Sequence, residues 1–324
     1  MRRRDFIALV GAAGLGALPA QGQQRAKRRI GVLMGSDPSD QQMKDRVAVL
    51  VNELQKLGWV SGHDVQVDVS WDGGNQERAI KNAKAFADAS VDVIVANGTI
   101  GIIAARKATP TIPIVFAVVG NPVGRHFVES LAHPGGNATG FSAFEPEIVG
   151  KWIELLKEVA PNIKQISVLH FSGFDFLWQG AEAAAPKLAV QVVKANCTKP
   201  SEVQSSISAL AGRPDTALIV LPVPFFAANR QLIIQLAGTH RIPAIYPFRY
   251  YAKSGGLVSY GIDAIDIYRR AAAYVDRILK GERPANLPVQ APSKFELVIN
   301  LKASKALGMS LPSTLLARAD EVIE

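Results

Sequence analysis

The 324-residue chain contains a single cysteine, Cys197. One cysteine excludes an internal disulfide bond and a cysteine-cluster metal site. The five histidines lack the helical spacing of metal ligands, so we expect no metal. The sequence also lacks the G-x-S-x-G motif of a nucleophile elbow, and its glycine-rich residues 134–137 lack the Lys-Ser/Thr ending of a phosphate-binding loop. These absences give no support to an enzyme, and we expect no cofactor.

The chain lacks an apolar run long enough to cross a membrane. The uncharged run at residues 8–20 falls short of the roughly 20 residues that span a bilayer as a helix. It follows a twin-arginine pattern, Arg3 and Arg4, and precedes small residues at a cleavage-site spacing. This layout is typical of an export signal. We predict that residues 1–22 are a cleaved twin-arginine signal peptide and that the mature chain is periplasmic; a short N-terminal membrane anchor is the alternative.

A basic face suited to nucleic acid is also missing. The formal net charge is +8, and part of it lies in residues 25–29, just before the first predicted strand. The remaining charges are dispersed, whereas nucleic-acid binding needs a basic face with a reading element. We therefore expect no nucleic-acid partner and interpret residues 25–29 as a solvated leader.

Buried strands alternate with amphipathic helices along the rest of the chain, a pattern typical of parallel β-α-β units. We predict strands at residues 30–34, 65–69, 91–96, 114–119, 165–169, 190–193, 217–221, 244–246, 257–260 and 295–300. We predict helices at about residues 47–57, 76–89, 101–108, 145–159, 201–211, 227–239 and 265–279. The pattern restarts after a glycine-rich connection at residues 133–140, and the length suits two domains. The predicted fold class is α/β, with two doubly wound parallel sheets.

Ligands bind open parallel sheets beyond the carboxyl ends of the strands, so the loops after the strands are candidate sites. Gly98 and Thr99 precede a predicted helix, whose N–H groups can bind a carboxylate. The alternative is that Thr99 only caps this helix. Asp37 and Asp263 can each bind an ammonium group, or they are ordinary turn formers.

Aromatic residues cluster after the strands of the second half. Residues 170–178 are the densest aromatic stretch, and we expect Phe171 and Phe174 to line a cleft and Phe176 to pack in the core. Arg249 lies in a second aromatic stretch and can pair with a ligand carboxylate, or it is a plain surface arginine.

Several segments match one known family. They are residues 108–116, 131–142 (LAHPGGNATGFS), 151–156, 255–261 (GGLVSYG), 268–281, 286–289 (NLPV), 295–301 and 315–324. The match covers nearly the whole mature chain in the right order. The sequence resembles the substrate-binding proteins of ABC transporters, in the group related to bacterial tryptophan- and tyrosine-binding receptors.

The resemblance implies a type I periplasmic binding fold, in which two lobes joined by three crossings close on a small ligand. The lobes would be residues 28–142 with 262–289, and residues 143–261 with 290–324. The receptor would present its ligand to an ABC permease in the inner membrane, and we expect a monomer. A sensor that reports to a signalling receptor is one alternative, and a two-domain hydrolase or isomerase is another.

Two positions depart from the family pattern. Family members commonly have Asp where this chain has Asn121, and Asn and Pro where it has residues 171–174. We expect the ligand to be a small carboxylate, such as an aromatic or branched amino acid or a related acid. The expected ligand-binding residues are Asp37, Gly98, Thr99, Asn121, Phe171, Phe174, Arg249 and Asp263.

Overall fold

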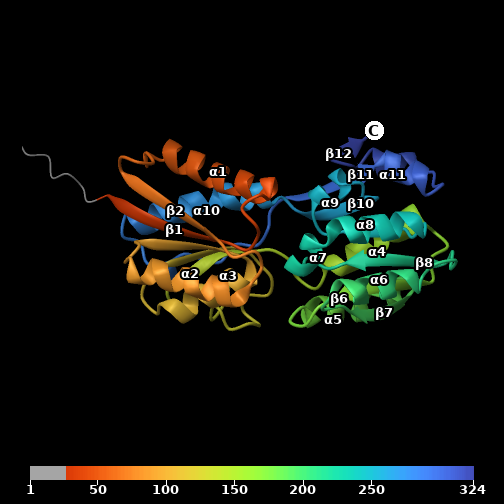
Figure 1. Cartoon of the computed structure of the whole chain (residues 1–324), viewed down its shortest axis with the longest axis horizontal. Helices are drawn as coiled ribbons and strands as arrows, with labels where there is room; N and C mark the ends of the chain where they lie inside the picture. Colours follow the sequence, from red (N-terminus) through yellow and green to blue (C-terminus); the bar gives the residue numbers. More distant parts are fainter. Residues whose placement is uncertain (1–26) are drawn as a thin grey trace, which may run out of the picture.

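Two β-sheets organise the chain, as the computed structural model shows for residues 27–324 (Figure 1). The first sheet has the strand order β2-β1-β3-β4-β5, and the second has the order β12-β11-β10-β9-β8-β6-β7. Every strand pair in the described part of the chain is parallel except β10 with β11. This arrangement confirms the predicted α/β class with two parallel sheets. The predicted signal peptide lies outside the described residues.

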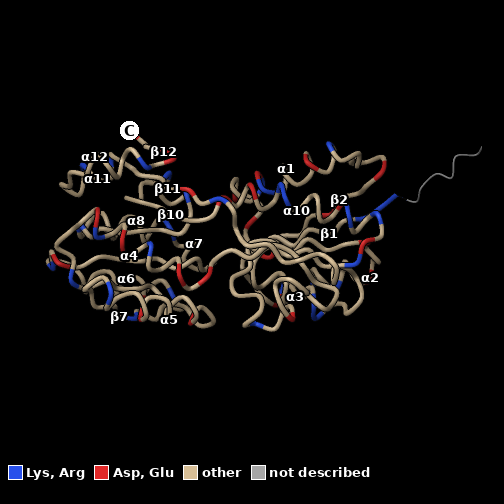
Figure 2. Tube along the Cα trace, turned by 180° about the vertical axis from the view of Figure 1, so that it is seen from behind, with Lys and Arg blue, Asp and Glu red and all other residues tan. Residues whose placement is uncertain are grey.

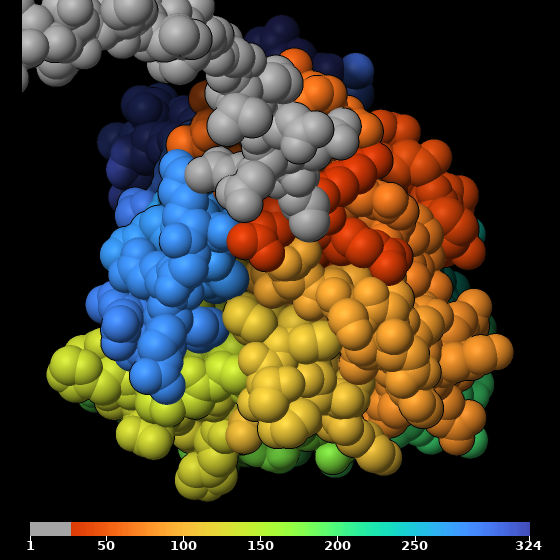
Figure 3. Space-filling view, turned by 90° about the vertical axis from the view of Figure 1, so that its left-hand side faces the viewer, coloured from red at the N-terminus to blue at the C-terminus, as the bar shows by residue number. Residues whose placement is uncertain are grey.

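We call the first sheet with its covering helices the first lobe. Its strands are β1 (Arg28–Met34), β2 (Val65–Trp71), β3 (Val93–Asn97), β4 (Ile114–Val119) and β5 (Ala138–Ser142). Its helices are α1 (Gln41–Lys56), α2 (Gln76–Asp88), α3 (Gly98–Ala108) and α10 (Ala264–Leu279). Although α10 is distant in sequence, it packs against α1 and the first sheet. Figure 3 shows its light-blue surface beside the orange and yellow surface of this lobe.

The second sheet and its helices form the second lobe. Its strands are β6 (Gln165–His170), β7 (Gln191–Asn196), β8 (Thr216–Val220), β9 (Ala244–Tyr246), β10 (Val258–Ile262), β11 (Phe295–Asn300) and β12 (Glu321–Ile323). Its helices are α4 (Ile148–Val159), α5 (Asp175–Ala184), α6 (Pro200–Ser208), α7 (Pro224–Ala228), α8 (Arg230–Thr239), α9 (Arg249–Lys253), α11 (Leu301–Ala306) and α12 (Ser313–Leu316). Short 3-10 turns lie at Pro186–Leu188 and Pro284–Asn286.

The inner strands β1, β3 and β4 of the first sheet are buried on both faces, which explains why they appear in the sequence as continuous apolar runs, whereas the edge strand β2 is only partly buried and alternates polar with apolar residues. Val32 and Val95 belong to the hydrophobic cluster that contains residues of α1 and α10. Their neighbours Leu33 and Ile94 belong to a second cluster, which contains residues of α2 and α3. Side chains alternate between the faces of a strand, so β1 and β3 each contribute to both clusters.

Strand β5 was not predicted, because residues 133–140 have the composition of a connection. Gly140 has φ +151° and lies beside β4, where a Cβ would collide with the backbone of Phe116. Glycine is therefore required for the close approach of these two strands. The structure also shows α9 and β12, which no periodic pattern predicted, and it divides the helix expected at residues 227–239 into α7 and α8.

Three chain segments connect the lobes, and they are hydrogen-bonded to one another. After β5, the Ser142 N–H donates to the Gln290 carbonyl at 2.9 Å, and the Gln290 N–H donates to the Gly140 carbonyl at 2.9 Å. Between β10 and α10, the Asp263 N–H donates to the Lys294 carbonyl at 3.1 Å. The three connections therefore form one hydrogen-bonded unit.

Acidic and basic residues are interspersed over both lobes (Figure 2). A search of the described residues finds no helix that combines the length and the apolar character needed to span a bilayer. The same residues contain no group of three or more potential metal-binding side chains.

Candidate ligand-binding site

The loops that follow the parallel strands of the two lobes contact each other. Arg125, in the loop after β4, donates a hydrogen bond to the carbonyl of Gly173, in the loop after β6. Its guanidinium carbon lies 5.7 Å from the ring centres of both Phe174 and Phe176. Arg46 of α1 lies 5.8 Å from the ring of Phe248, which follows β9. These contacts bring together the strand ends at which ligands bind in this class of fold.

Asp37 forms a turn in the first lobe. Its Oδ1 accepts hydrogen bonds from the Ser39 N–H at 2.9 Å and the Ser39 hydroxyl at 2.7 Å. These hydrogen bonds lower the pKa of the exposed Asp37 carboxyl below its usual value. In this conformation Asp37 therefore acts as a turn former, which is the alternative to binding an ammonium group.

Gly98 and Thr99 lie in the first turn of α3, which begins three residues earlier than predicted. The N-cap residue is Asn97, so Thr99 does not cap the helix. The Asn97 side chain makes no capping hydrogen bond; its Oδ1 accepts one from the Tyr268 hydroxyl at 2.8 Å. The first N–H groups of an α-helix have no partner within the helix, so this end of α3 can bind an anion.

Asn121 begins the loop that contacts the second lobe. It has φ +48°, and its Oδ1 accepts a hydrogen bond from the Gly124 N–H at 3.0 Å. Asparagine is one of the residues that tolerate a left-handed backbone, and its side chain closes the turn. Asn121 therefore shapes the loop that carries Arg125.

The aromatic side chains of the second lobe contact one another in pairs. Phe171 lies 5.8 Å from Phe225, and Phe174 lies 6.2 Å from Phe176, measured between ring centres. Phe171 and Phe174 are half-buried, whereas Phe176 is buried. The burial of Phe176 agrees with its predicted role in packing, and the other two rings lie near the surface that contacts the first lobe.

Arg249 and Asp263 both have partners within the chain. The Arg249 guanidinium pairs with Glu296 at 2.8 Å and also with Glu321. Asp263 caps α10 by accepting from the Asp266 N–H at 3.0 Å, and it pairs with Lys294 at 3.0 Å. Burial alone would raise the pKa of Asp263, but these hydrogen bonds outweigh it and lower the pKa. In this conformation neither side chain presents an unused charge to a ligand.

Asp72 was not predicted as a site residue, although it directly follows β2. It is 1% exposed, and its Oδ1 accepts from the Gly74 N–H at 2.7 Å. Among the described residues its Oδ2 has no hydrogen-bond partner. Burial raises the pKa of this carboxyl to about 6. In sequence it resembles an ordinary turn, Asp-Gly-Gly, so only its position after a strand distinguished it.

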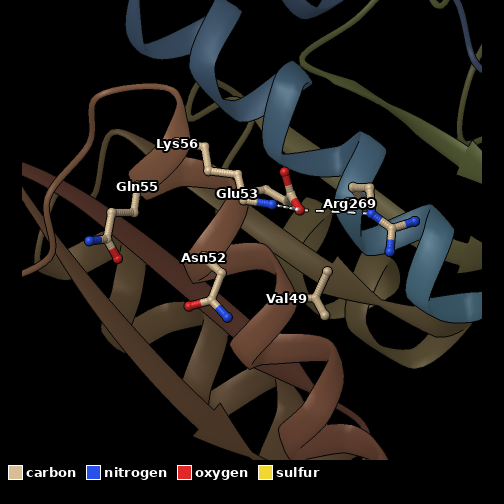
Figure 4. Close-up of a pocket in the computed structure, with 6 residues that line it drawn as sticks. All are labelled: Val49, Asn52, Glu53, Gln55, Lys56 and Arg269. Carbon is tan, nitrogen blue, oxygen red and sulfur yellow. Dashed lines mark hydrogen bonds and ion pairs between the residues drawn. The ribbon is translucent and has the colours of Figure 1, made fainter.

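A surface hollow lies between α1 and α10 (Figure 4). It is lined by Val49, Asn52, Glu53, Gln55, Lys56 and Arg269. Glu53 pairs with Lys56 at 2.9 Å and with Arg269 at 3.7 Å. Both helices belong to the first lobe, so a ligand in this hollow would not contact the second lobe.

Comparison with known proteins agrees with this architecture. Residues 34–323 match the family described as ABC transporter substrate binding protein. A tyrosine-binding protein of Clostridioides difficile (strain R20291) is 28% identical over 265 residues, which cover 80% of this chain and 75% of the relative.

Two solved structures are similar over almost the whole chain. The ABC domain in complex with L-Trp from Streptococcus pneumonia is 26% identical and has a TM-score of 0.84, covering 92% of this chain and 100% of the other. The ligand-free, open structure of CD0873, a substrate binding protein with adhesive properties from Clostridium difficile, is 27% identical with a TM-score of 0.71. This second match covers 92% of this chain and 99% of the other.

These matches confirm the family that the sequence resembles, a family of binding proteins and not of enzymes. Both solved structures share the fold of two lobes over most of their length. The chain belongs to the family of ABC transporter substrate-binding proteins, with the α/β fold of periplasmic binding proteins.

Proposed function

We propose that this chain is the exported receptor of an ABC importer and that it binds an aromatic or branched amino acid, or a related acid, between its lobes. The observation that carries the proposal is the similarity over 92% of the chain to a structure in complex with L-Trp. The tyrosine-binding relative supports the same ligand class. We further propose that residues 1–22 direct export to the periplasm and that an inner-membrane permease receives the ligand.

The proposed mechanism is closure of the two lobes on the ligand. We assign residues 28–142 with 262–289 to one lobe, and residues 143–261 with 290–324 to the other. A ligand favours the closed state only by the difference in its affinity for the two states. Moving from a 1:99 to a 99:1 population requires about 5.5 kcal/mol of that difference. The greater similarity to the L-Trp complex than to the open structure supports a mechanism in which lobe orientation changes.

The proposed ligand contacts divide by lobe. On the first lobe, Gly98 and Thr99 at the start of α3 would hold the ligand through N–H groups and a hydroxyl. On the second lobe, Phe171 and Phe174 would contact its apolar body. Asp37, Asn121, Arg249 and Asp263 would contribute only where ligand binding replaces the partners that they have in this structure.

A binding screen by thermal shift and calorimetry tests the proposal. The probes are L-Trp, L-Tyr, L-Phe, L-Leu and the corresponding deaminated acids, with D-glucose as the control. A ligand at 100 times its Kd should raise the unfolding free energy by about 2.7 kcal/mol. Tight binding of sugars with no binding of carboxylates would refute the proposed ligand class.

A further inference from the structure

Arg46 is an arginine held almost out of solvent where the lobes meet. It lies on α1 of the first lobe and is 4% exposed. Its guanidinium contacts the ring of Phe248 in the second lobe. In the part of the chain that the structure describes, Arg46 has neither an ion pair nor a hydrogen-bond acceptor. Within residues 27–324, none of its five N–H donors is both sealed from solvent and without a partner, so they remain accessible to a ligand.

An unpaired charge in such a position is costly, because removing an ion from water costs more than a single cation–π contact returns. Contact with an aromatic ring engages the positive charge but none of the N–H donors. Buried arginines therefore normally find an acceptor or an anion. A negatively charged group from outside the chain would supply such a partner for Arg46.

Other arginines near the place where the lobes meet already have partners. Arg125 donates to the Gly173 carbonyl. Arg230 donates to the Ala227 carbonyl at 3.1 Å, and Arg249 pairs with two glutamates. Among the described residues, each of these three arginines keeps a buried Nε without a partner, but each makes at least one hydrogen bond within the chain, which Arg46 does not.

Those surroundings are aromatic. The Phe248 ring stacks on Tyr250 with 5.3 Å between ring centres and 15° between planes. Burial raises the pKa of the Tyr250 phenol, and the nearby charges of Arg46 and Arg230 oppose this rise. Asp40 is the carboxylate at the same end of α1, but it is used as the N-cap and accepts from the Gln42 N–H at 3.0 Å. A carboxylate that reaches Arg46 would therefore meet a positive charge beside an aromatic ring.

We propose that Arg46 binds the carboxylate of the ligand, with Phe248 holding the guanidinium in position. This inference rests on the proposed function and adds Arg46 of α1 to the start of α3 as a partner for the charged end of the ligand. A guanidinium matches a carboxylate by two parallel hydrogen bonds, which selects acids over amides and amines. Because Phe248 belongs to the other lobe, capture of the carboxylate is linked to closure.

The test compares the wild type and Arg46 variants, each with an acid ligand and with the amide of that ligand. Calorimetry measures the Kd of the best amino acid from the screen and of its amide, which keeps the side chain and the ammonium group. The wild type should bind the acid at least tenfold more tightly than the amide. Arg46→Gln should weaken the acid on the order of 10–100-fold and the amide less than threefold. The affinity of Arg46→Lys for the acid should lie between those of the wild type and Arg46→Gln, because lysine keeps the positive charge but lacks the two parallel N–H donors of the guanidinium.

Arg125→Gln is the matched control, since Arg125 also crosses between the lobes onto aromatic rings. It should change the affinities for acid and amide by the same factor. Circular dichroism and thermal unfolding establish that each variant is folded, and the acid–amide comparison in the wild type needs no variant. If Arg46→Gln weakened both ligands equally, or if the wild type did not distinguish them, the assignment would be overturned while the receptor function stood. If no carboxylate bound the wild type, the proposed function would fail, and this inference with it.

Discussion

The two lobes present different chemistry at the ends of their strands. In the first lobe, the buried Asp72 Oδ2 has no hydrogen-bond partner among the described residues, and the guanidinium of the buried Arg46 contacts an aromatic ring. In the second lobe, the charged Arg249 is paired within the chain, and half-buried aromatic rings such as Phe171 and Phe174 follow the strands. One lobe is thus suited to a charged head group and the other to an apolar body. This asymmetry is what an amino acid or an aromatic acid requires, and each prediction below tests one side of it.

The largest expected effect concerns the buried carboxyl of the first lobe. The pKa of Asp72 is raised to about 6 in the folded protein, from 3.8 as its ordinary value. Between these values the folded protein binds more protons than the unfolded chain, so stability falls as pH rises from about 4 to 6. Relative to Asp72→Asn, the wild type should lose up to about 3 kcal/mol of unfolding free energy between pH 4 and pH 7. Urea titrations across this pH range measure the difference.

Asp37→Asn is the control for this prediction. The pKa of Asp37 is lowered by its hydrogen bonds from Ser39, so its effect has the opposite sign and appears as pH falls below 4. If the stability of the wild type and of Asp72→Asn changed in parallel with pH, burial would not raise the pKa of the Asp72 carboxyl. The first lobe would then lose the main support for its polar character.

The next effect tests the aromatic side. Replacing Phe171 or Phe174 by Ala should weaken ligand binding by about 1–3 kcal/mol, if each ring packs against the apolar body of the ligand. Calorimetry with the best ligand from the screen measures the change. Phe127→Ala, in the first lobe beside Arg106, is a control that should leave the Kd unchanged. Equal losses in all three variants would point to altered folding and not to ligand contact.

A smaller effect is expected at the start of α3. Thr99→Ala should weaken binding by about 1 kcal/mol if its hydroxyl makes one ordinary hydrogen bond to the ligand. Thr99→Ser keeps the hydroxyl and should retain most of the affinity. If Ala and Ser behaved alike in calorimetry, the hydroxyl would have no role, and only the backbone N–H groups of α3 would remain as contacts.

The smallest effect concerns contact between the lobes. Arg125→Gln removes the charge above Phe174 and Phe176 and should favour the open state by about 0.5–1 kcal/mol, the range of exposed cation–π contacts. Small-angle scattering of the ligand-free protein should then show a larger radius of gyration. Unchanged scattering in the variant, together with an unchanged Kd, would mean that this contact does not influence closure.

Much of the fold could be predicted because its strands are short, apolar and separated by amphipathic helices. The strand predicted at residues 114–119 and the helix at 76–89 match β4 and α2 closely. Strand β5 could not be predicted in this way, because Gly140 is needed for its close approach to β4 and makes the segment resemble a loop. The separate α9 also gave no periodic signal, since it has only five residues.

Site residues were harder to predict than elements. Arg46 had a signal that was not used, since it lies four residues before the buried Leu50 and eight before Leu54, on the same helix face. A charged residue on such a face needs a partner, and its identity depends on what packs opposite. Conversely, the aromatic stretch around Arg249 suggested a ligand contact, whereas the structure pairs this arginine with Glu296 and Glu321 from distant strands.

By itself, the sequence determined the α/β class, the division into two parallel sheets and the membership of a family of solute receptors. These follow from periodicity and from local motifs, which act over a few turns or strands of the chain. Only the tertiary structure decided which charges remain available, because pairing joins residues such as Arg249 and Glu321 that are 72 positions apart. It also decided that Asp72 and Arg46 are buried, since burial depends on the elements that pack above them. The chemistry of the proposed site therefore depends on long-range packing that no local pattern contains.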